Sequence, residues 1–314
     1  MNAWSLFTGI GGFDLGLERA GWRIDLQCEA DEYRRAVLAE RFPGVPCADD
    51  VRAVRVGEPT SRTAADPVTA ANDGGREAGT GLPARPDLIC GGFPCQDLSV
   101  AGQRAGLAGE RSGLWWEFHR IIDTVRPRWA LIENVPGLLS SNHGRDFAAL
   151  IDSMDRIGYV GAWRILDSRY FGVPQRRRRV FILATPAEHD PRGERCAEVL
   201  AVGTRCHRHP EARGEAGPEV TAALAGRSAS RLDDACAGGG QLVPDRYWEG
   251  CATIGALTAA GVRRLTAREC ERLQAFPDDW TLVGKHSDSR RYAALGDAVT
   301  VNVIEWIGRR LIAC

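Results

Sequence analysis

The chain has 314 residues, a length that suits one large domain or one domain with a smaller lobe. Apolar residues make up 44% of it, enough for a hydrophobic core, and the net charge of −1 gives no sign of a polybasic tail. No apolar run reaches the length of a membrane span, and none of the ten cysteines stands in a Cys-x-x-Cys pair. We therefore expect a protein of the reducing cytoplasm, without a disulfide framework and, since the chain opens into a strand-like run, without a signal peptide.

Strand and helix signals alternate through the first half of the chain. Apolar runs bounded by glycine or proline predict strands, and apolar residues at helical spacing predict helices. The expected strands are 4–8, 23–28, 86–90, 129–133, 162–167 and 180–184, and the expected helices are 12–20, 32–42, 114–125 and 146–157. This repeated order predicts an α/β fold in which helices cover both faces of a mostly parallel sheet.

Two stretches interrupt the alternation. Residues 57–85 are rich in Gly, Ala, Thr and Pro, and we expect a flexible surface insertion there. Residues 186–262 are also irregular and would form a smaller lobe. Four residues of this lobe are of types that bind metals and lie near one another in the sequence. Their spacing matches no zinc pattern, so we expect no metal site. They are Cys196, Cys206, His207 and His209.

Regular structure returns near the end of the chain. A helix is expected over 266–274, where Thr266 and Glu269 have the spacing of a capping box, and an amphipathic helix over 299–311. We divide the chain into a catalytic and cofactor-binding domain, residues 1–185 and 290–314, and a small domain, residues 186–289.

A glycine-rich turn follows the first expected strand. In Gly9-Ile10-Gly11-Gly12 the glycines let a ligand approach the backbone, and the start of the next helix offers free N–H groups. Glu29 stands 20 residues after Gly9, where an acidic residue commonly binds ribose hydroxyls. The turn lacks the third glycine of the dinucleotide-binding pattern. It therefore favours a nucleoside cofactor over a nicotinamide dinucleotide, with a purely structural turn as the alternative.

A cysteine on a stiff loop follows the expected strand 86–90. Gly91 and Gly92 permit a tight turn, and Pro94 fixes its own φ and lacks a backbone donor. Cys95 would then lie at the carboxyl edge of the sheet, where open α/β sheets bind ligands. From these residues alone, a nucleophile and a small buried hydrophobe are equally good interpretations.

Several blocks, taken together and in order, resemble those of the C5-cytosine DNA methyltransferases, which use S-adenosylmethionine. The blocks are Phe7 to Gly12, Gly92 to Gln96, Glu133 to Val135, Gln175 to Arg179, Arg264 to Arg272, and Gly296 to Val299. The resemblance covers residues 4–185 and 263–311 apart from the insertion. It implies a Rossmann-like S-adenosylmethionine-dependent methyltransferase fold with a small, irregular target-recognition lobe.

The resemblance also implies a site for S-adenosylmethionine, which leaves as S-adenosylhomocysteine. Phe7 and the glycine turn would contact the adenosine and methionine parts, and Glu29 would bind the ribose hydroxyls. The family usually has Asn where this chain has Asp297, although a carboxylate still accepts hydrogen bonds. Asp50 and Val51 would address the adenine, and Leu114 would line the pocket. The cofactor-binding residues carried over are Phe7, Gly9, Gly11, Gly12, Glu29, Ala30, Asp50, Val51, Pro94, Leu114, Asp297 and Ala298.

Covalent catalysis at a cytosine is the chemistry that the resemblance implies. Cys95 would attack C6 of the ring, which makes C5 able to take a methyl group. Glu133 would protonate or hydrogen-bond N3, which requires a carboxyl with a raised pKa. Arg179 would bind O2, with Arg177 nearby, because alternate residues of an extended segment share a face.

The implied substrate is double-stranded DNA, from which the target cytosine must be flipped out. Residues 96–111 would form the mobile loop that closes over it, and Arg176 and Arg178 would face solvent or phosphate. Residues 186–262 would select the sequence. A monomer in the cytoplasm of a bacterial cell or a phage-infected host is expected, with a cognate restriction endonuclease as a candidate partner.

Other interpretations differ in substrate or in class. The same chemistry on tRNA is one, and the variable lobe before Arg264 favours DNA over it. A catalytically silent DNA-binding relative is another, opposed by the intact Cys95, Glu133 and Arg179. A nicotinamide oxidoreductase is the third, opposed by the missing glycine and by Pro94-Cys95.

Overall fold

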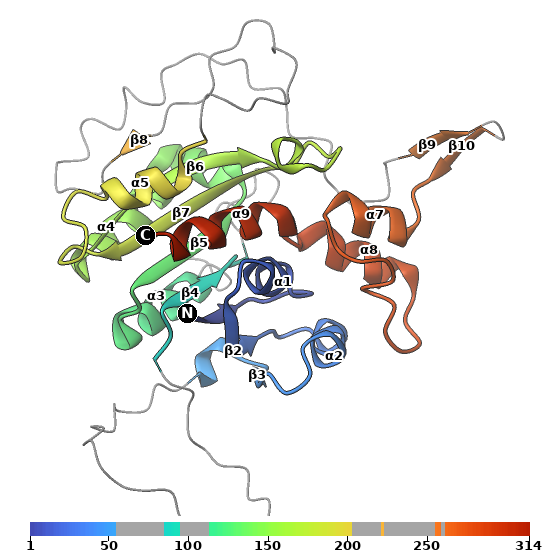
Figure 1. Cartoon of the computed structure of the whole chain (residues 1–314), viewed down its shortest axis with the longest axis horizontal. Coiled ribbons are helices and arrows are strands. Elements are labelled where there is room, and N and C mark those ends of the chain that lie inside the picture. The colour runs from blue at the N-terminus through green and yellow to red at the C-terminus, as the bar shows by residue number, and fades with distance from the viewer. Residues whose placement is uncertain (55–84, 95–112, 203–220, 223–254, 259–260) are drawn as a thin grey trace, which may run out of the picture.

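The computed structural model describes residues 1–54, 85–94, 113–202, 221–222, 255–258 and 261–314 (Figure 1). The insertion expected at 57–85, apart from Arg85, and the loop expected at 96–111 lie outside the described residues. So does most of the region 203–254.

A single eight-stranded sheet forms the centre of the described structure. In spatial order its strands are β3 (Cys47–Ala48), β2 (Arg23–Cys28), β1 (Asn2–Leu6), β4 (Leu88–Gly91), β5 (Trp129–Asn134), β7 (Arg178–Pro186), β6 (Tyr159–Asp167) and β8 (Thr221–Ala222). The strands from β3 to β5 pair in parallel. Strand β7 is antiparallel to β5 and to β6, and β8 is antiparallel to β6. The predicted α/β fold with a mostly parallel sheet is confirmed.

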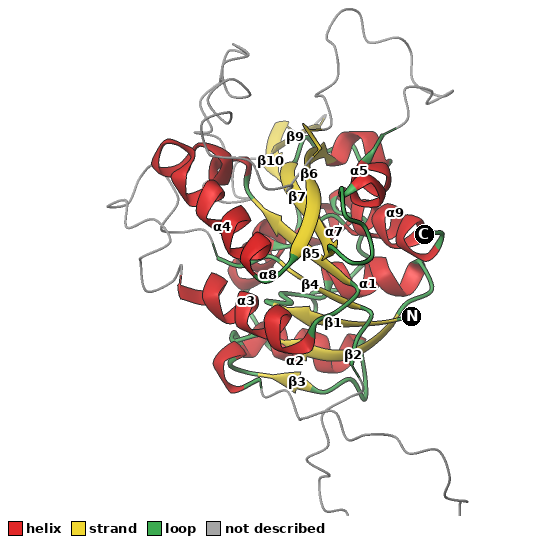
Figure 2. Cartoon of the chain, turned by 90° about the vertical axis from the view of Figure 1, so that its left-hand side faces the viewer, coloured by secondary structure: helices red, strands yellow, loops and turns green. Residues whose placement is uncertain are grey.

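Helices cover both faces of this sheet (Figure 2). Helices α1 (Gly12–Arg19), α5 (Glu194–Leu200) and α9 (Val301–Ile312) share one hydrophobic cluster with Leu88 and Leu131 of the sheet. Helices α3 (Gly113–Val125) and α4 (Arg145–Arg156) share the other with Ile89 and Ile132. Because successive side chains of a strand point to opposite faces and helices cover both, the central strands are buried on both sides and mostly apolar, with Glu133 and Asn134 at the end of β5 as polar exceptions. Strands β4 and β5 are buried along their whole length.

A third cluster joins the two ends of the chain. Helix α2 (Glu32–Arg41) packs there with α7 (Ala267–Leu273), α8 (Asp288–Asp297) and the loop between them. The expected capping box begins α7, since the Thr266 hydroxyl accepts from the Glu269 amide and the Glu269 carboxylate accepts from the Thr266 amide. Strands β9 (Gly255–Thr258) and β10 (Gly261–Arg264) pair as a ribbon that projects beside α7 (Figure 1).

The elements differ from the sequence prediction mainly at their ends. Strands β6 and β7 are longer than the expected 162–167 and 180–184, because they pair with each other from Tyr159 to Asp167. Strand β3 was not expected, since two residues carry no periodicity. Short 3-10 helices, η1 (Val51–Ala53), η3 (Pro136–Gly144) and η4 (Ser168–Phe171), follow β3, β5 and β6.

Helix α5 falls within the range 186–289 that the sequence assigns to the small domain. Its side chains Cys196, Val199 and Leu200 are nevertheless buried in the cluster on the main sheet. The two-part division stays a proposal, and the packing of α5 favours a first boundary after residue 202.

A buried carboxyl group links the first two strands to α1. Asp14 is inaccessible to solvent and accepts hydrogen bonds from Ser5 Oγ at 2.9 Å and Gln27 Nε2 at 2.7 Å. Burial raises the pKa of the Asp14 carboxyl from its ordinary value of 3.8 to about 6, against the effect of these two donors. The protonated form is therefore preferred in the folded chain at mildly acid pH.

Asp14→Asn should change how stability depends on pH. A carboxyl whose pKa is raised by folding stabilises the fold while it is protonated, and this contribution is lost as pH rises from 3.8 through about 6. Relative to the wild type, the variant should gain about 2 kcal/mol of unfolding free energy between pH 4 and pH 7, as measured by urea denaturation.

Asp25→Asn is the control with the opposite pH dependence, because Arg23 lowers the pKa of the Asp25 carboxyl. The stabilisation that the Asp25 carboxylate gives the fold is present at neutral pH and lost in acid. If the stability difference between Asp14→Asn and wild type does not vary with pH, the Asp14 carboxyl titrates normally and the interpretation is wrong.

Candidate active site

The candidate site lies where parallel neighbouring strands end. The turn Phe7 to Gly12 follows β1, Glu29 follows β2, the loop Gly92 to Pro94 follows β4, and Glu133 lies at the end of β5. Strands β2, β1, β4 and β5 are neighbours in the sheet, so their carboxyl ends meet at one edge. Open α/β sheets bind their ligands at such an edge.

The turn after β1 has a backbone that few residues can adopt. Gly9 and Gly11 have φ values of 62° and 84°, and Phe7 has φ 54°, which is uncommon for a residue with a side chain. A Cβ on Gly11 would also lie 2.4 Å from the ring of Phe42. The Thr8 hydroxyl ties the turn to both strands, because it donates to the Ser5 carbonyl of β1 at 2.8 Å and accepts from the Cys28 N–H of β2 at 3.1 Å. Unfavourable backbone held in place by its surroundings is typical of ligand sites.

Glu29 connects this turn to the end of β2. Its side chain is 8% exposed, and its two carboxylate oxygens accept from Gly9 N–H at 2.7 Å and Asp31 N–H at 2.9 Å. An ionised carboxylate can accept about four hydrogen bonds. Glu29 therefore keeps acceptor capacity for hydroxyl donors such as those of a ribose.

The other predicted cofactor residues surround the same edge. Phe7, Val51 and Leu114 all contact one hydrophobic cluster, and Asp50 begins the short helix η1 by accepting from Arg52 N–H at 2.9 Å. Ala30 is exposed beside Glu29. The glycine turn leaves room for a ligand, Glu29 can still accept hydrogen bonds, and apolar side chains lie nearby. These features together fit a cofactor that contains an adenosine.

Asp297 lies at the end of α8 and forms an ion pair with Arg34 of α2. The carbonyl of Ala298, the next residue, accepts from Arg177 at 2.6 Å. The sequence alone did not indicate Arg34, since nothing in the pattern of α2 distinguishes it from the neighbouring arginine.

Buried Glu133 forms an ion pair with half-buried Arg179. Arg179 Nε lies 2.9 Å from Glu133 Oε1, and the two side chains are 20% and 11% exposed. Burial raises the pKa of the Glu133 carboxyl, while Arg179 and Arg177 act to lower it. A carboxyl whose charged form is disfavoured can give a proton or a hydrogen bond to a ring nitrogen.

The loop Gly92 to Pro94 fits closely against Glu133. A Cβ on Gly92 would lie 2.5 Å from Glu133 Oε2, so a side chain there would displace the carboxylate. Asn134 Nδ2 donates to the carbonyl of Phe93 at 3.3 Å, and Asn134 Oδ1 accepts from Val135 N–H at 2.8 Å. These contacts fix the segment that leads to Cys95, which itself lies outside the described residues, as do Cys206, His207 and His209.

The arginine run alternates between buried and exposed positions. Arg177 is buried and donates to the carbonyls of Gly296 and Ala298, at 2.9 and 2.6 Å. Arg179 is turned toward Glu133, whereas Arg176 and Arg178 are exposed. The run thus divides into Arg177 and Arg179, which face the candidate site, and Arg176 and Arg178, which face solvent.

Comparisons with known proteins agree with this geometry. A family model described as C-5 cytosine-specific DNA methylase matches residues 1–222 and 227–313. The chain is 34% identical to Type II methyltransferase M2.BsuMI of Bacillus subtilis (strain 168), over 99% of this chain and 75% of that protein. It is 29% identical to Type II methyltransferase M.NgoBI of Neisseria gonorrhoeae, over 96% of this chain and 89% of that protein.

Solved structures show the same fold at low identity. The Entamoeba histolytica methyltransferase EhMeth superposes with a TM-score of 0.60 at 14% identity, covering 100% of this chain and 98% of that one. A mutant of Spodoptera frugiperda DNMT2 superposes with a TM-score of 0.59 at 16% identity, covering 99% of both chains. These superpositions and the order of the strands in the sheet identify the fold as the Rossmann-like methyltransferase fold.

The chain belongs to the C-5 cytosine-specific DNA methylase family, and its activity is DNA (cytosine-5-)-methyl transfer. The family and the fold imply an enzyme that depends on S-adenosylmethionine. The alternative of a tRNA substrate is not favoured. Within the described residues no helix is long and apolar enough to cross a membrane.

Gly92→Ala should impair methyl transfer because the new methyl group would meet Glu133 Oε2. We expect a loss of roughly a hundredfold in kcat, as small displacements of catalytic groups cause. The assay is transfer of labelled methyl groups to unmethylated genomic DNA, with the melting temperature measured in parallel.

The matched control is Gly137→Ala, at a position where the nearest atom to a Cβ is Val135 Cγ2 at 3.9 Å. If Gly92→Ala retained the activity of this control, the close contact with Glu133 would be unimportant for the reaction.

Proposed function

We propose that the chain methylates C5 of a flipped-out cytosine in double-stranded DNA through a covalent bond between Cys95 Sγ and C6 of the ring. The observation that carries this proposal is the buried Glu133, which is ion-paired with Arg179 and in close contact with the loop leading to Cys95. A pyrimidine accepts a nucleophile more readily when a carboxyl with a raised pKa gives its ring nitrogen a proton or a hydrogen bond and a cation lies nearby.

S-adenosylmethionine, when bound, supplies an electrophilic methyl group, and S-adenosylhomocysteine leaves. In the proposed site Glu29 holds the ribose hydroxyls with the acceptor capacity that remains to it, and the N–H groups of the glycine turn face the cofactor. The apolar Val51 and Leu114 flank the adenine together with Asp50. The full set of proposed cofactor residues is Phe7, Gly9, Gly11, Gly12, Glu29, Ala30, Asp50, Val51, Pro94, Leu114, Asp297 and Ala298.

The reaction begins when the thiolate of Cys95 forms a bond to C6. Glu133 gives a proton or a hydrogen bond to N3 at the same time, so that the electron pair of the C5–C6 double bond becomes available at C5. Arg179 stabilises the negative charge at O2, and Arg177 contributes positive charge nearby. After C5 is methylated, water or hydroxide removes the C5 proton, the S–C6 bond breaks, and the double bond and the thiolate are restored.

The target carbon is unreachable in a stacked duplex, so the cytosine must leave the helix. The exposed Arg176 and Arg178 support a role in phosphate binding, which positions the enzyme without reading sequence. Sequence selection is assigned to the small domain, residues 186–289, and closure over the base to residues 96–111.

The proposed setting of the enzyme is a restriction-modification system. Relatives carry the name Type II methyltransferase, which supports a cognate restriction endonuclease as its partner. A monomer acting on DNA in the cytoplasm of a bacterial cell or a phage-infected host completes the proposal.

Cys95→Ser should abolish methyl transfer, because a serine hydroxyl is a much weaker nucleophile than a thiolate. Labelled methyl transfer to unmethylated genomic DNA should fall at least about a thousandfold. Binding of S-adenosylhomocysteine, measured by calorimetry, should persist.

Cys314→Ser, at an exposed thiol, serves as the control and should keep wild-type activity. Turnover by Cys95→Ser equal to that of the control would rule out the covalent mechanism.

Glu29→Ala should weaken cofactor binding, because it removes the ribose acceptor and also leaves the N–H groups of Gly9 and Asp31 without their partner. Loss of charge-assisted hydrogen bonds predicts a rise of at least about tenfold in the Kd for S-adenosylhomocysteine. Glu32→Ala, an exposed neighbour in the first turn of α2, should leave the Kd unchanged. An equal Kd for both variants would remove Glu29 from the ribose site.

A further inference from the structure

A tryptophan far along the chain reaches into the turn between β1 and α1. The indole Nε1 of Trp280 donates to the carbonyl of Ile10 at 2.8 Å, and both residues are buried. Ile10 stands between Gly9 and Gly11, which have φ values of 62° and 84°. Glycines allow many backbone conformations, so a turn built on them needs outside contacts to keep one shape.

The indole ring of Trp280 is itself held on several sides. Its centroid lies 5.8 Å from that of Phe42 and 5.6 Å from that of Phe276. Arg41 lies over the ring at 5.5 Å and donates through Nε to the carbonyl of Trp280 at 2.9 Å. Phe42 is also the residue that a Cβ on Gly11 would strike. The ring is therefore fixed against the same turn that its N–H group contacts.

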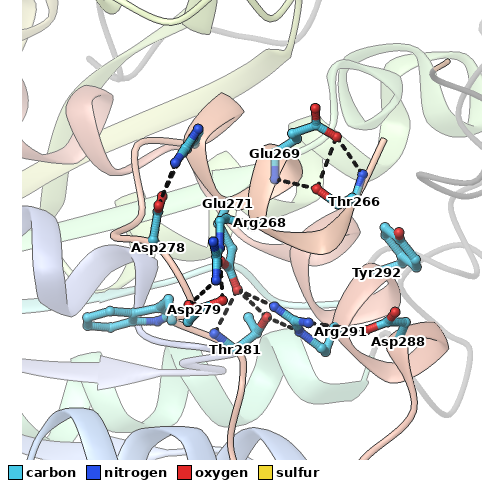
Figure 3. A network of polar contacts seen from close by, with 12 residues as sticks. Thr266, Arg268, Glu269, Glu271, Asp278, Asp279, Thr281, Asp288, Arg291 and Tyr292 are labelled. Atoms are coloured by element: carbon cyan, nitrogen blue, oxygen red, sulfur yellow. Dashed lines mark hydrogen bonds and ion pairs between the residues drawn. The ribbon is translucent and has the colours of Figure 1, made fainter. Parts of the chain in front are cut away.

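The loop that carries Trp280 is braced from α7 and α8 (Figure 3). Buried Glu271 accepts from Thr281 N–H at 2.9 Å and pairs with Arg291 at 3.2 Å. On the surface, Arg268 donates to Asp279. Asp279 has φ 59°, a value that a non-glycine residue keeps only when its surroundings impose it.

We propose that Trp280 is a positioning residue for the cofactor turn: its indole N–H holds the Ile10 carbonyl and thereby keeps the turn in the shape that binds S-adenosylmethionine. The proposal rests on the proposed function, in which the turn Phe7 to Gly12 contacts that cofactor. Trp280 does not take part in the chemistry. It acts through the backbone of the turn, and it makes cofactor affinity depend on the loop between α7 and α8.

The alternative is that Trp280 only stabilises the fold, and a second tryptophan provides the means to separate the two. Trp22 Nε1 donates to the carbonyl of Gly308 at 3.0 Å, and Trp22 is buried to a similar extent. This bond lies beyond the carboxyl end of α1, whereas the turn lies at its amino end. Trp280→Phe and Trp22→Phe thus remove the same kind of bond, once at the turn and once away from it.

The test compares these variants with the wild type in the full-length protein. Calorimetry with S-adenosylhomocysteine should give a Kd raised about three- to tenfold in Trp280→Phe, as expected for one lost hydrogen bond, and an unchanged Kd in Trp22→Phe. Melting temperatures should fall in both. In the cofactor-free protein, amide exchange at Gly11 and Gly12 should be faster in Trp280→Phe alone. The KM for S-adenosylmethionine should rise with the Kd, and the KM for DNA should not.

Equal Kd values for Trp280→Phe and Trp22→Phe would overturn the proposal. If Trp280→Phe fails to fold, Arg41→Gln loosens the ring by removing the bond to the Trp280 carbonyl, and it should raise the Kd about twofold. An unchanged Kd in that variant would count equally against the role of Trp280. Absence of binding by the wild type would instead refute the proposed function on which this inference rests.

Discussion

The ion pair between buried Glu133 and half-buried Arg179 is the interaction on which the arrangement of the site depends. Two charges taken out of water are stable only when they lie close together and their neighbours are placed to match. Strand β7 supplies this closeness because it runs antiparallel to β5, with Glu133 opposite Phe181 and Asn134 opposite Val180. A reversed strand at this position brings the start of β7, where the arginines are, to the edge at which β5 ends.

Close approach of the backbone around this pair requires glycine. Gly92 leaves room for the Glu133 carboxylate, and Gly91 lies against the carbonyl of Leu6, where a Cβ would come within 2.1 Å. Gly12 likewise faces the carbonyl of Val299, where a Cβ would come within 2.8 Å. Glycine therefore lets the segments after β1 and β4 come close to their neighbours at this edge.

The last part of the chain completes the edge that the first part begins. Arg177 donates to carbonyls at the end of α8, Asp297 pairs with Arg34, and Trp280 donates to Ile10. The carboxyl end of α8 thus constrains Arg177, and the loop after α7 constrains the turn after β1.

Local pattern in the sequence was enough for most of the elements, for the capping box at Thr266 and for the two glycine turns, because each depends on neighbouring residues. Glu29 could be singled out by its place at the end of a strand, 20 residues after Gly9, and Glu133 by the family resemblance of its block. Tertiary structure alone decided that β6 and β7 pair along their full length, that α5 packs on the main sheet, and that Arg34 and Trp280 contact the site. The contacts of Trp280 with Ile10 and of Arg34 with Asp297 join residues more than 200 positions apart, and no periodicity in a short window reports them.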